Sequence, residues 1–125
     1  MEKHLTILNQ YTLKSSAREF AAAIDALVTR VEAEGDPGIL SYRFFVNKGD
    51  RTATGIIDYN SPRAWIGHHD IAMDWPEMKA LHGVATLAEV TFLGPLTDEI
   101  RDWIANSTLT ARIRSGNRFA SGFQR

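Results

Sequence analysis

The sequence predicts a single domain of the α+β class, and three observations support this. Segments in which large apolar residues alternate with polar ones, as in β-strands, occur between segments with apolar residues at helical spacing. These patterns follow the order strand, helix, strand, strand, helix, strand, with a further helix and a tail at the end. The chain has 125 residues, 44% of them hydrophobic, which suits one packed domain rather than two.

The first strand and the first helix have the clearest patterns. Alternation from His4 to Leu13 predicts a strand whose odd-numbered residues share one face. Ser16 and Glu19, three residues apart, match a capping box at a helix N-terminus. Apolar residues at helical spacing follow, and Gly35 ends the helix.

The next segments predict a β-hairpin. Strands are expected over Ile39–Asn47 and Thr52–Tyr59, with turn residues at positions 48–50 between them. The first of these strands carries apolar side chains on both faces, Phe44 on one and Phe45 on the other. Because the helices can cover only one face of the sheet, we expect the other face to pack on the sheet of a second copy. The sequence therefore predicts a homodimer.

The second half of the domain predicts helices, one strand and a last helix. A helix is expected from Pro62 to about Met73, and a shorter one from Pro76 to His82 after the break at Trp75-Pro76. A strand over Val84–Leu93 and a helix capped by Thr97 complete the pattern. The order is that of the ferredoxin-like βαββαβ arrangement, with a four-stranded antiparallel sheet and both long helices on one face.

Charge separates the chain into a domain over residues 1–107 and a basic tail over residues 108–125. The net charge of −1 comes from 14 basic and 15 acidic residues, but the tail holds four arginines and no acid. We expect the tail to dock on its own or the partner subunit and to bury Phe119 and Phe123. The acidic domain argues against a nucleic-acid partner.

Several classes of protein are excluded or disfavoured by composition. The chain has no cysteine, so it forms no disulfide and has no thiolate nucleophile. No apolar run approaches the roughly 18–20 residues of a membrane span, so no membrane partner is expected. The N-terminal residues lack a signal-peptide pattern, which predicts a cytoplasmic protein.

Polar and aromatic residues within apolar patterns are the candidates for chemistry. His68 shares a helical stripe with Ala64, Ile71 and Trp75, and its ordinary pKa suits a general base. Adjacent helical residues diverge by about 100°, so only one of His68 and His69 is expected to face a pocket, and no metal site is expected. A buried histidine without a catalytic task is the alternative.

Two further residue types complete this candidate site. Asn9 is an amide among apolar neighbours, which either holds a substrate oxygen or dioxygen or makes a structural hydrogen bond. Trp65 and Trp75 are expected to line an aromatic pocket for a planar ligand, or else to fill the core.

Local motifs in residues 4–94 resemble a known family. They are the strand motif over residues 8–13, Pro37-Gly38 before the second strand, the pattern over Ala64–His68, and the short segment Met78–His82. These resemble the antibiotic biosynthesis monooxygenase-like proteins of the dimeric α+β barrel superfamily. The resemblance implies a dimer formed by sheet-to-sheet packing, with a pocket between sheet and helices in each subunit. Some members oxygenate polycyclic phenols or quinols with dioxygen and without metal or flavin.

The resemblance also implies roles for residues of this chain. For a cofactor-independent oxygenase it implies a polar trio of Asn9, Trp65 and either Tyr11 or Tyr42. In that reading His68 deprotonates a small aromatic substrate. Related members bind and degrade haem, and His82 then lies near the position of the axial ligand, while the tryptophan position falls on His68. A non-catalytic dimer that binds a small apolar ligand, of a stress-response type, is a further alternative.

Overall fold

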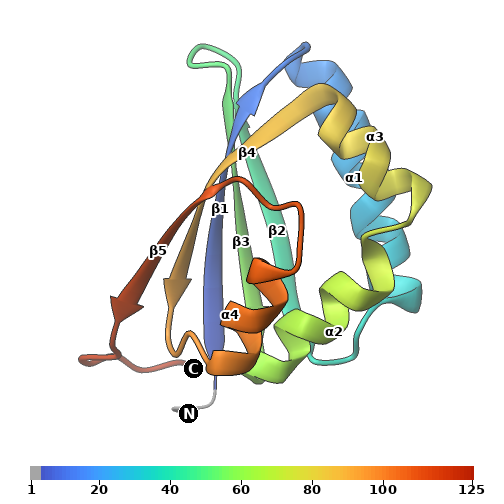
Figure 1. Cartoon of the computed structure of the whole chain (residues 1–125). Helices are drawn as coiled ribbons and strands as arrows, with labels where there is room; N and C mark the ends of the chain where they lie inside the picture. Colours follow the sequence, from blue (N-terminus) through green and yellow to red (C-terminus); the bar gives the residue numbers. More distant parts are fainter. Residues whose placement is uncertain (1–3) are drawn as a thin grey trace.

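The computed structural model describes residues 4–125 as one sheet covered by helices (Figure 1). The elements follow in the order β1 (Leu5–Leu13), α1 (Ala17–Glu34), β2 (Ile39–Asn47), β3 (Thr52–Tyr59), α2 (Pro62–Ala72), α3 (Pro76–Val84), β4 (Ala85–Leu93), α4 (Asp98–Ala105) and β5 (Arg112–Asn117). The predicted α+β class and the βαββαβ order of the first part are confirmed. No helix in the described residues has the length and apolar character of a membrane span.

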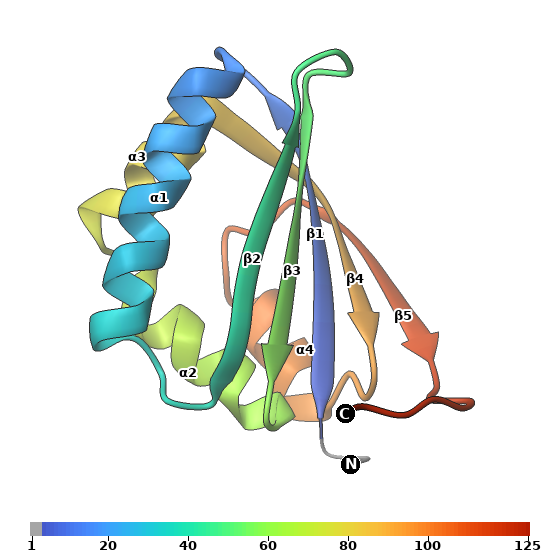
Figure 2. The ribbon, with the colours of Figure 1, turned by 180° about the vertical axis from the view of Figure 1, so that it is seen from behind.

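The sheet has the strand order β2-β3-β1-β4-β5. β1 pairs antiparallel with both β3 and β4, and β2 pairs antiparallel with β3. The helices all lie on one side of the sheet, as the two opposite views show (Figures 1 and 2). This face is called the inner face below, and the opposite face is called the outer face.

The expectation of a four-stranded antiparallel sheet is wrong, because β5 adds a fifth, parallel strand. β5 lies in the segment that charge alone marks as a tail, and it pairs with β4 so that Ile113 lies beside Val90. Ile113 packs against the core, and the Nδ2 of Asn117 donates to the carbonyl oxygen of Phe92 at 3.0 Å. With one apolar residue in its short length, this strand depends on those tertiary contacts and has no pattern of its own.

Beyond β5 the two phenylalanines of the tail are exposed. Phe119 and Phe123 are 76% and 81% accessible in the single chain. Their burial against a partner subunit stays a prediction. Sheet-to-sheet packing also stays a prediction. It would bury Phe45 and Leu93, whose side chains are exposed on the outer face.

Capping side chains fix the helix starts where the sequence predicts them. The Oγ of Ser16 accepts from the backbone N–H of Glu19 at 3.0 Å, and the Glu19 carboxylate accepts from the N–H of Ser16. Ser61 caps α2 by accepting from the N–H of Ala64 at 3.3 Å. These bonds satisfy backbone donors that a helix leaves free at its first turn.

Two clusters of buried side chains fill the space between sheet and helices. The α1–α3 core consists of Tyr11, Leu13, Phe20, Ile24, Leu27, Val31, Ala53, Ala72, Met78, Leu81 and Ala85. The α2–α4 core consists of Leu5, Ile7, Ile57, Tyr59, Ala64, Trp65, Ile66, Val90, Phe92 and Ile100. The candidate site lies where these two clusters meet.

Candidate functional site

A cavity of about 290 Å³ opens between the inner face of the sheet and the helices. Its walls come from β1, β2, β3 and the start of β4, from α2 and α3, and from Trp103 of α4. The segment 107–111, which connects α4 to β5, forms a further wall. Figure 1 shows this segment arching past the strands on the helical side before β5 joins the sheet edge.

Most of the residues that the sequence singles out meet in this cavity. The predicted residues that line it are Asn9, Tyr11, Tyr42, Trp65, His68 and His82. They come from β1, β2, α2 and α3, which are far apart in sequence. The structure therefore brings an amide, a tryptophan, histidines and tyrosines within one enclosed space.

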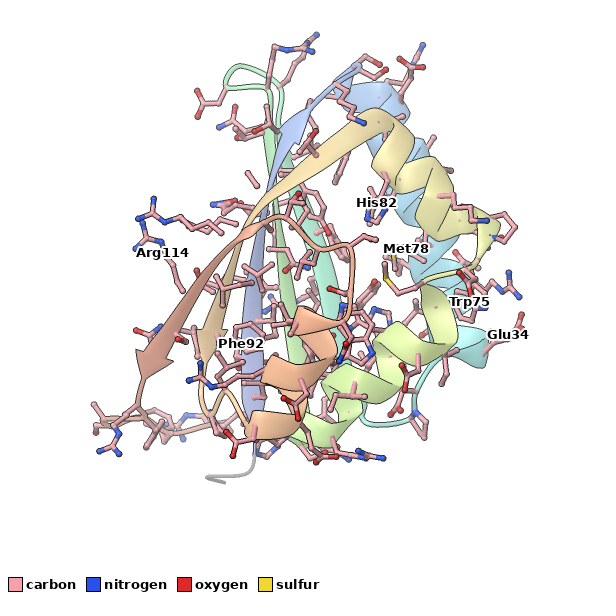
Figure 3. The ribbon with its side chains drawn as sticks, viewed as in Figure 1. Glu34, Trp75, Met78, His82, Phe92 and Arg114 are labelled. Atoms are coloured by element: carbon pink, nitrogen blue, oxygen red, sulfur yellow. The ribbon has the colours of Figure 1, made fainter. Side chains whose placement is uncertain are left out.

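Trp75 does not line the cavity, so the prediction that places it there is wrong. The Arg30 guanidinium lies 4.2 Å above its ring, and the side chain packs beside the α1–α3 core. Figure 3 shows Trp75 away from the sheet, whereas Met78 and His82 extend from α3 toward it. The helical stripe fails because the backbone of Trp75 is extended, so the spacing counted from His68 does not continue to it. Ile71, on the same supposed stripe, is 40% exposed.

His68 is almost completely enclosed, with 3% of its surface accessible. Its Nε2 lies 3.3 Å from the hydroxyl of Tyr42. Its Nδ1 is buried and has no hydrogen-bond partner among the described residues. Burial, and secondarily the nearby His69, lowers the pKa of His68 to about 3, so the ring is neutral at physiological pH.

His69 also lines the cavity, which corrects the expectation that only one of the two adjacent histidines faces it. Both rings line the same cavity although adjacent helical residues diverge by about 100°. The Nδ1–H of His69 donates to the carbonyl oxygen of Trp65 at 2.7 Å. Burial lowers the pKa of His69 to about 4, against opposing effects of this hydrogen bond and of Asp70.

The tyrosines that line the cavity are un-ionised hydrogen-bonding groups. Burial raises the pKa of Tyr11 to about 12, and it raises the pKa values of Tyr42 and Tyr59 well above their ordinary value. The Nδ2 of Asn9 lies 3.5 Å from the Tyr11 hydroxyl, which it reaches as a donor. Asn9 and Tyr11 stand on the same face of β1, two residues apart, as alternation predicts.

Lys14 and His82 lie at the edge of the cavity near the end of β1. The Nζ of Lys14 donates to the backbone oxygen of His82 at 2.8 Å. Burial, together with the charge of Lys14, lowers the pKa of His82. No aspartate or glutamate lines the cavity in the part of the chain that the structure describes. The site thus favours neutral or anionic ligands over cationic ones.

Sequence reasoning missed Tyr59, His69, Trp103 and the wall over residues 107–111. Trp103 could be placed on the apolar face of its helix, but no signal showed that α4 packs against α2. The Nε1–H of Trp103 donates to Asp70 of α2 at 2.8 Å, and its ring meets Trp65 edge-on at 5.2 Å. This contact brings the segment after α4 over the cavity.

The cavity does not fit haem. At about 290 Å³ it lies at the small end of ligand pockets, which span about 300–1,000 Å³. Lys14 is the one lysine or arginine among its lining residues, whereas haem carries two propionates. Among residues 4–125, no cluster of three histidine, aspartate or glutamate side chains could hold a metal ion.

Comparison with known proteins identifies relatives of the fold. No family model and no curated protein matches the sequence. SnoaB, a cofactor-independent oxygenase from Streptomyces nogalater, matches with a TM-score of 0.64 and 16% identity over 76% of this chain and 95% of that chain. MupZ from Pseudomonas fluorescens matches with a TM-score of 0.73 and 16% identity over 98% of this chain and 95% of that chain.

A third structure, a candidate antibiotic biosynthesis monooxygenase from Caulobacter crescentus, has a TM-score of 0.56 and 19% identity. It covers 76% of this chain and 92% of that chain. The match to MupZ takes in almost the whole chain, so it includes α4 and β5. The chain has the fold of the antibiotic biosynthesis monooxygenase-like proteins, as the sequence motifs predict.

Proposed function

We propose that this protein is a cofactor-independent oxygenase that acts on a small aromatic molecule with an ionisable hydroxyl group. The observation that carries the proposal is the meeting of Asn9, Trp65 and two neutral histidines in one cavity. The similarity in fold to SnoaB, a cofactor-independent oxygenase, supports the same reaction class.

The reaction requires a base and a group that holds the oxygen anion. A neutral histidine of α2 takes a proton from the CH2 carbon of the substrate's keto tautomer, and the electron pair of the C–H bond delocalises over the ring system and the oxygen, which gives the same anion as ionisation of the hydroxyl group. Dioxygen accepts electrons from this carbanion and forms a C–O bond, which gives a hydroperoxide after protonation. Cleavage of the O–O bond releases water and leaves a ring carbonyl. The substrate supplies all the electrons, so no separate reductant is needed.

Asn9 and Tyr42 contact the substrate in this proposal. The amide of Asn9 donates to the developing oxyanion or to dioxygen, and the Tyr42 hydroxyl, which lies against Nε2 of His68, binds the hydroxyl end. The aromatic ring of the substrate packs against Trp65. The tyrosines stay protonated because their pKa values are raised, so they act as donors and not as bases.

A sheet-to-sheet homodimer is part of the proposal. The outer face carries Phe45 and Leu93 as exposed apolar side chains, and the half-buried Leu8 and Ile56 lie between them in the strand register. Burial of these residues on a second copy would stabilise the assembly through the hydrophobic effect. The cavity opens on the inner face, so dimer formation leaves it free.

Oxygen consumption with a panel of polycyclic quinols and anthrones tests the proposal. We expect uptake of dioxygen with formation of the quinone, and a loss of about 100-fold or more in kcat/KM for Asn9→Ala. His4→Gln is the control, and it should leave oxygen uptake unchanged, because His4 is exposed and lies outside the cavity. Binding of the probes without oxygen uptake would reject the oxygenase and favour a non-catalytic ligand-binding dimer.

A further inference from the structure

The two histidines in the cavity differ in which of their nitrogens a substrate could use. His68 has neither nitrogen open: its Nε2 faces the Tyr42 hydroxyl at 3.3 Å, and its Nδ1 is buried. His69 is half-buried, and its Nδ1 is committed to the Trp65 carbonyl oxygen at 2.7 Å. A carbonyl oxygen only accepts, so Nδ1 carries the proton and Nε2 of the neutral ring has a free lone pair.

The ring of His69 is held in an aromatic slot. Trp65 lies against it in a tilted arrangement, with centroids 4.0 Å apart and planes at 32°, and Trp103 meets it edge-on at 5.2 Å. Trp103 is itself anchored by the hydrogen bond from its Nε1–H to Asp70 at 2.8 Å. The slot and the Trp65 carbonyl together fix both the orientation and the tautomer of the imidazole, which is what a general base requires.

Two neighbours of His69 partly offset the effect of burial and favour the charged ring that proton transfer produces. An imidazolium whose centroid lies 4.0 Å from that of Trp65 gains a cation–π interaction. The carboxylate of Asp70 is close enough to favour the charged form of His69. The neighbours of His68 are arranged differently: Tyr42 meets its ring edge-on, with planes at 76° and centroids 5.3 Å apart, and the Tyr59 centroid is 6.3 Å away. The nearby charged group that acts on the pKa of His68 is His69, which disfavours the charged form.

We infer that His69, rather than His68, is the catalytic base, and that its Nε2 takes the proton from the substrate. The C–H bond of the substrate breaks, its electron pair stays on the ring system, and an N–H bond forms at Nε2. This inference rests on the proposed function, since it assigns the first step of that reaction. Trp103 and Asp70 are then positioning residues, which act through the orientation of His69.

Hydrogen–deuterium exchange at the acidic ring carbon of anthrone, followed by NMR without oxygen, isolates the proton-transfer step. We expect His69→Ala to slow the exchange by about 100-fold or more. We expect added imidazole to restore much of the rate, because it can enter the slot that the substitution leaves open between Trp65 and Trp103. His68→Ala is the matched control, and we expect a smaller loss that imidazole does not restore.

Nitrogen-15 NMR of the free protein supplies a readout that needs no substrate, and we expect the Nδ1–H tautomer at His69. An Nε2–H tautomer would overturn the inference, and so would unchanged exchange in His69→Ala or imidazole rescue of His68→Ala. Anthrone that quenches tryptophan fluorescence but undergoes no exchange in the wild type would also overturn it. Exchange that depends on His69 without any oxygen uptake would support the base and reject the oxygenase.

Discussion

The two ends of the helical layer use buried space differently. The α1–α3 core is filled by aliphatic and aromatic side chains from the long helix α1, and Leu27 there has no accessible surface. The α2–α4 core includes a tryptophan, and beside it two histidines line the cavity. His68 is as enclosed as an aliphatic core residue, yet its Nδ1 has no partner among the described residues.

This difference separates stability from function within one small fold. Apolar burial at the α1–α3 end supplies free energy that does not depend on pH. Buried imidazoles at the other end stabilise less than apolar groups of the same size, because their polar atoms lose water. Stability and site chemistry should therefore respond to different substitutions and to different solution conditions.

The largest effect is expected from a cavity in the α1–α3 core. Leu27→Ala removes a fully buried side chain, which typically costs about 2–5 kcal/mol of unfolding free energy. Urea denaturation measures the loss. Glu32→Ala on the exposed side of the same helix is the control, with an expected change within about 0.5 kcal/mol. Equal effects of the two substitutions would contradict the assigned core.

The second effect is acid destabilisation through the histidines of α2. The pKa of His68 is lowered from 6.5 to about 3 in the folded protein, and burial is the main cause. The unfolded chain therefore binds a proton that the folded protein does not, and stability falls as the pH drops below 6.5. Between pH 6.5 and about pH 5, proton binding to His68 in the unfolded chain lowers the free energy of unfolding by on the order of 2 kcal/mol. His69 acts in the same direction.

Urea denaturation across this pH range checks the second effect. His68→Gln has no titrating group at this position, so its stability should decline less steeply with falling pH than that of the wild type. His4→Gln, which changes an exposed histidine outside the cavity, should leave the slope as it is. If the stability of His68→Gln depends on pH as steeply as that of the wild type, His68 titrates normally in the folded state.

The same contrast explains what could be predicted from the sequence. The capping box at Ser16 and the apolar positions of α1 are local signals, and both are found in the structure. The inward position of Asn9 follows from strand alternation. These features depend on periodicity and on neighbouring residues, which are visible in a single sequence.

Features that depend on long-range packing could not be predicted. β5 forms because Ile113 and Asn117 meet β4, and no local pattern indicates this. The cavity reaches His69 because Trp103, 34 positions later in the sequence, closes its other side. The expected position of Trp75 is wrong because the helical stripe ends where the backbone of Trp75 becomes extended.

Two glycines, one at each end of the helical layer, give the third test. A Cβ at Gly67 of α2 would collide with the carboxylate of Asp36, whose other oxygen accepts from the N–H of Gly38 at 2.7 Å. We expect Gly67→Ala to destabilise the protein by about 1–3 kcal/mol, as overpacking does. A Cβ at Gly83 of α3 meets nothing within 4 Å, so Gly83→Ala should stabilise by up to about 1 kcal/mol. Thermal denaturation of the pair should give opposite signs, and equal signs would reject the tight packing at α2.

The smallest effect concerns the strand that closes the α2–α4 end. Arg114 of β5 donates to Glu89 of β4 at 2.7 Å, with side chains 52% and 26% accessible. An ion pair this exposed contributes about 0–1 kcal/mol, so Arg114→Gln should lower stability slightly at low salt and not at high salt. Arg112→Gln on the same strand is the matched control, because Arg112 forms no salt bridge with the described residues. A loss of stability above this range that persists at high salt would mean that β5 detaches when its ion pair is removed. Substrate affinity should then fall as well, because the segment before β5 forms a wall of the cavity.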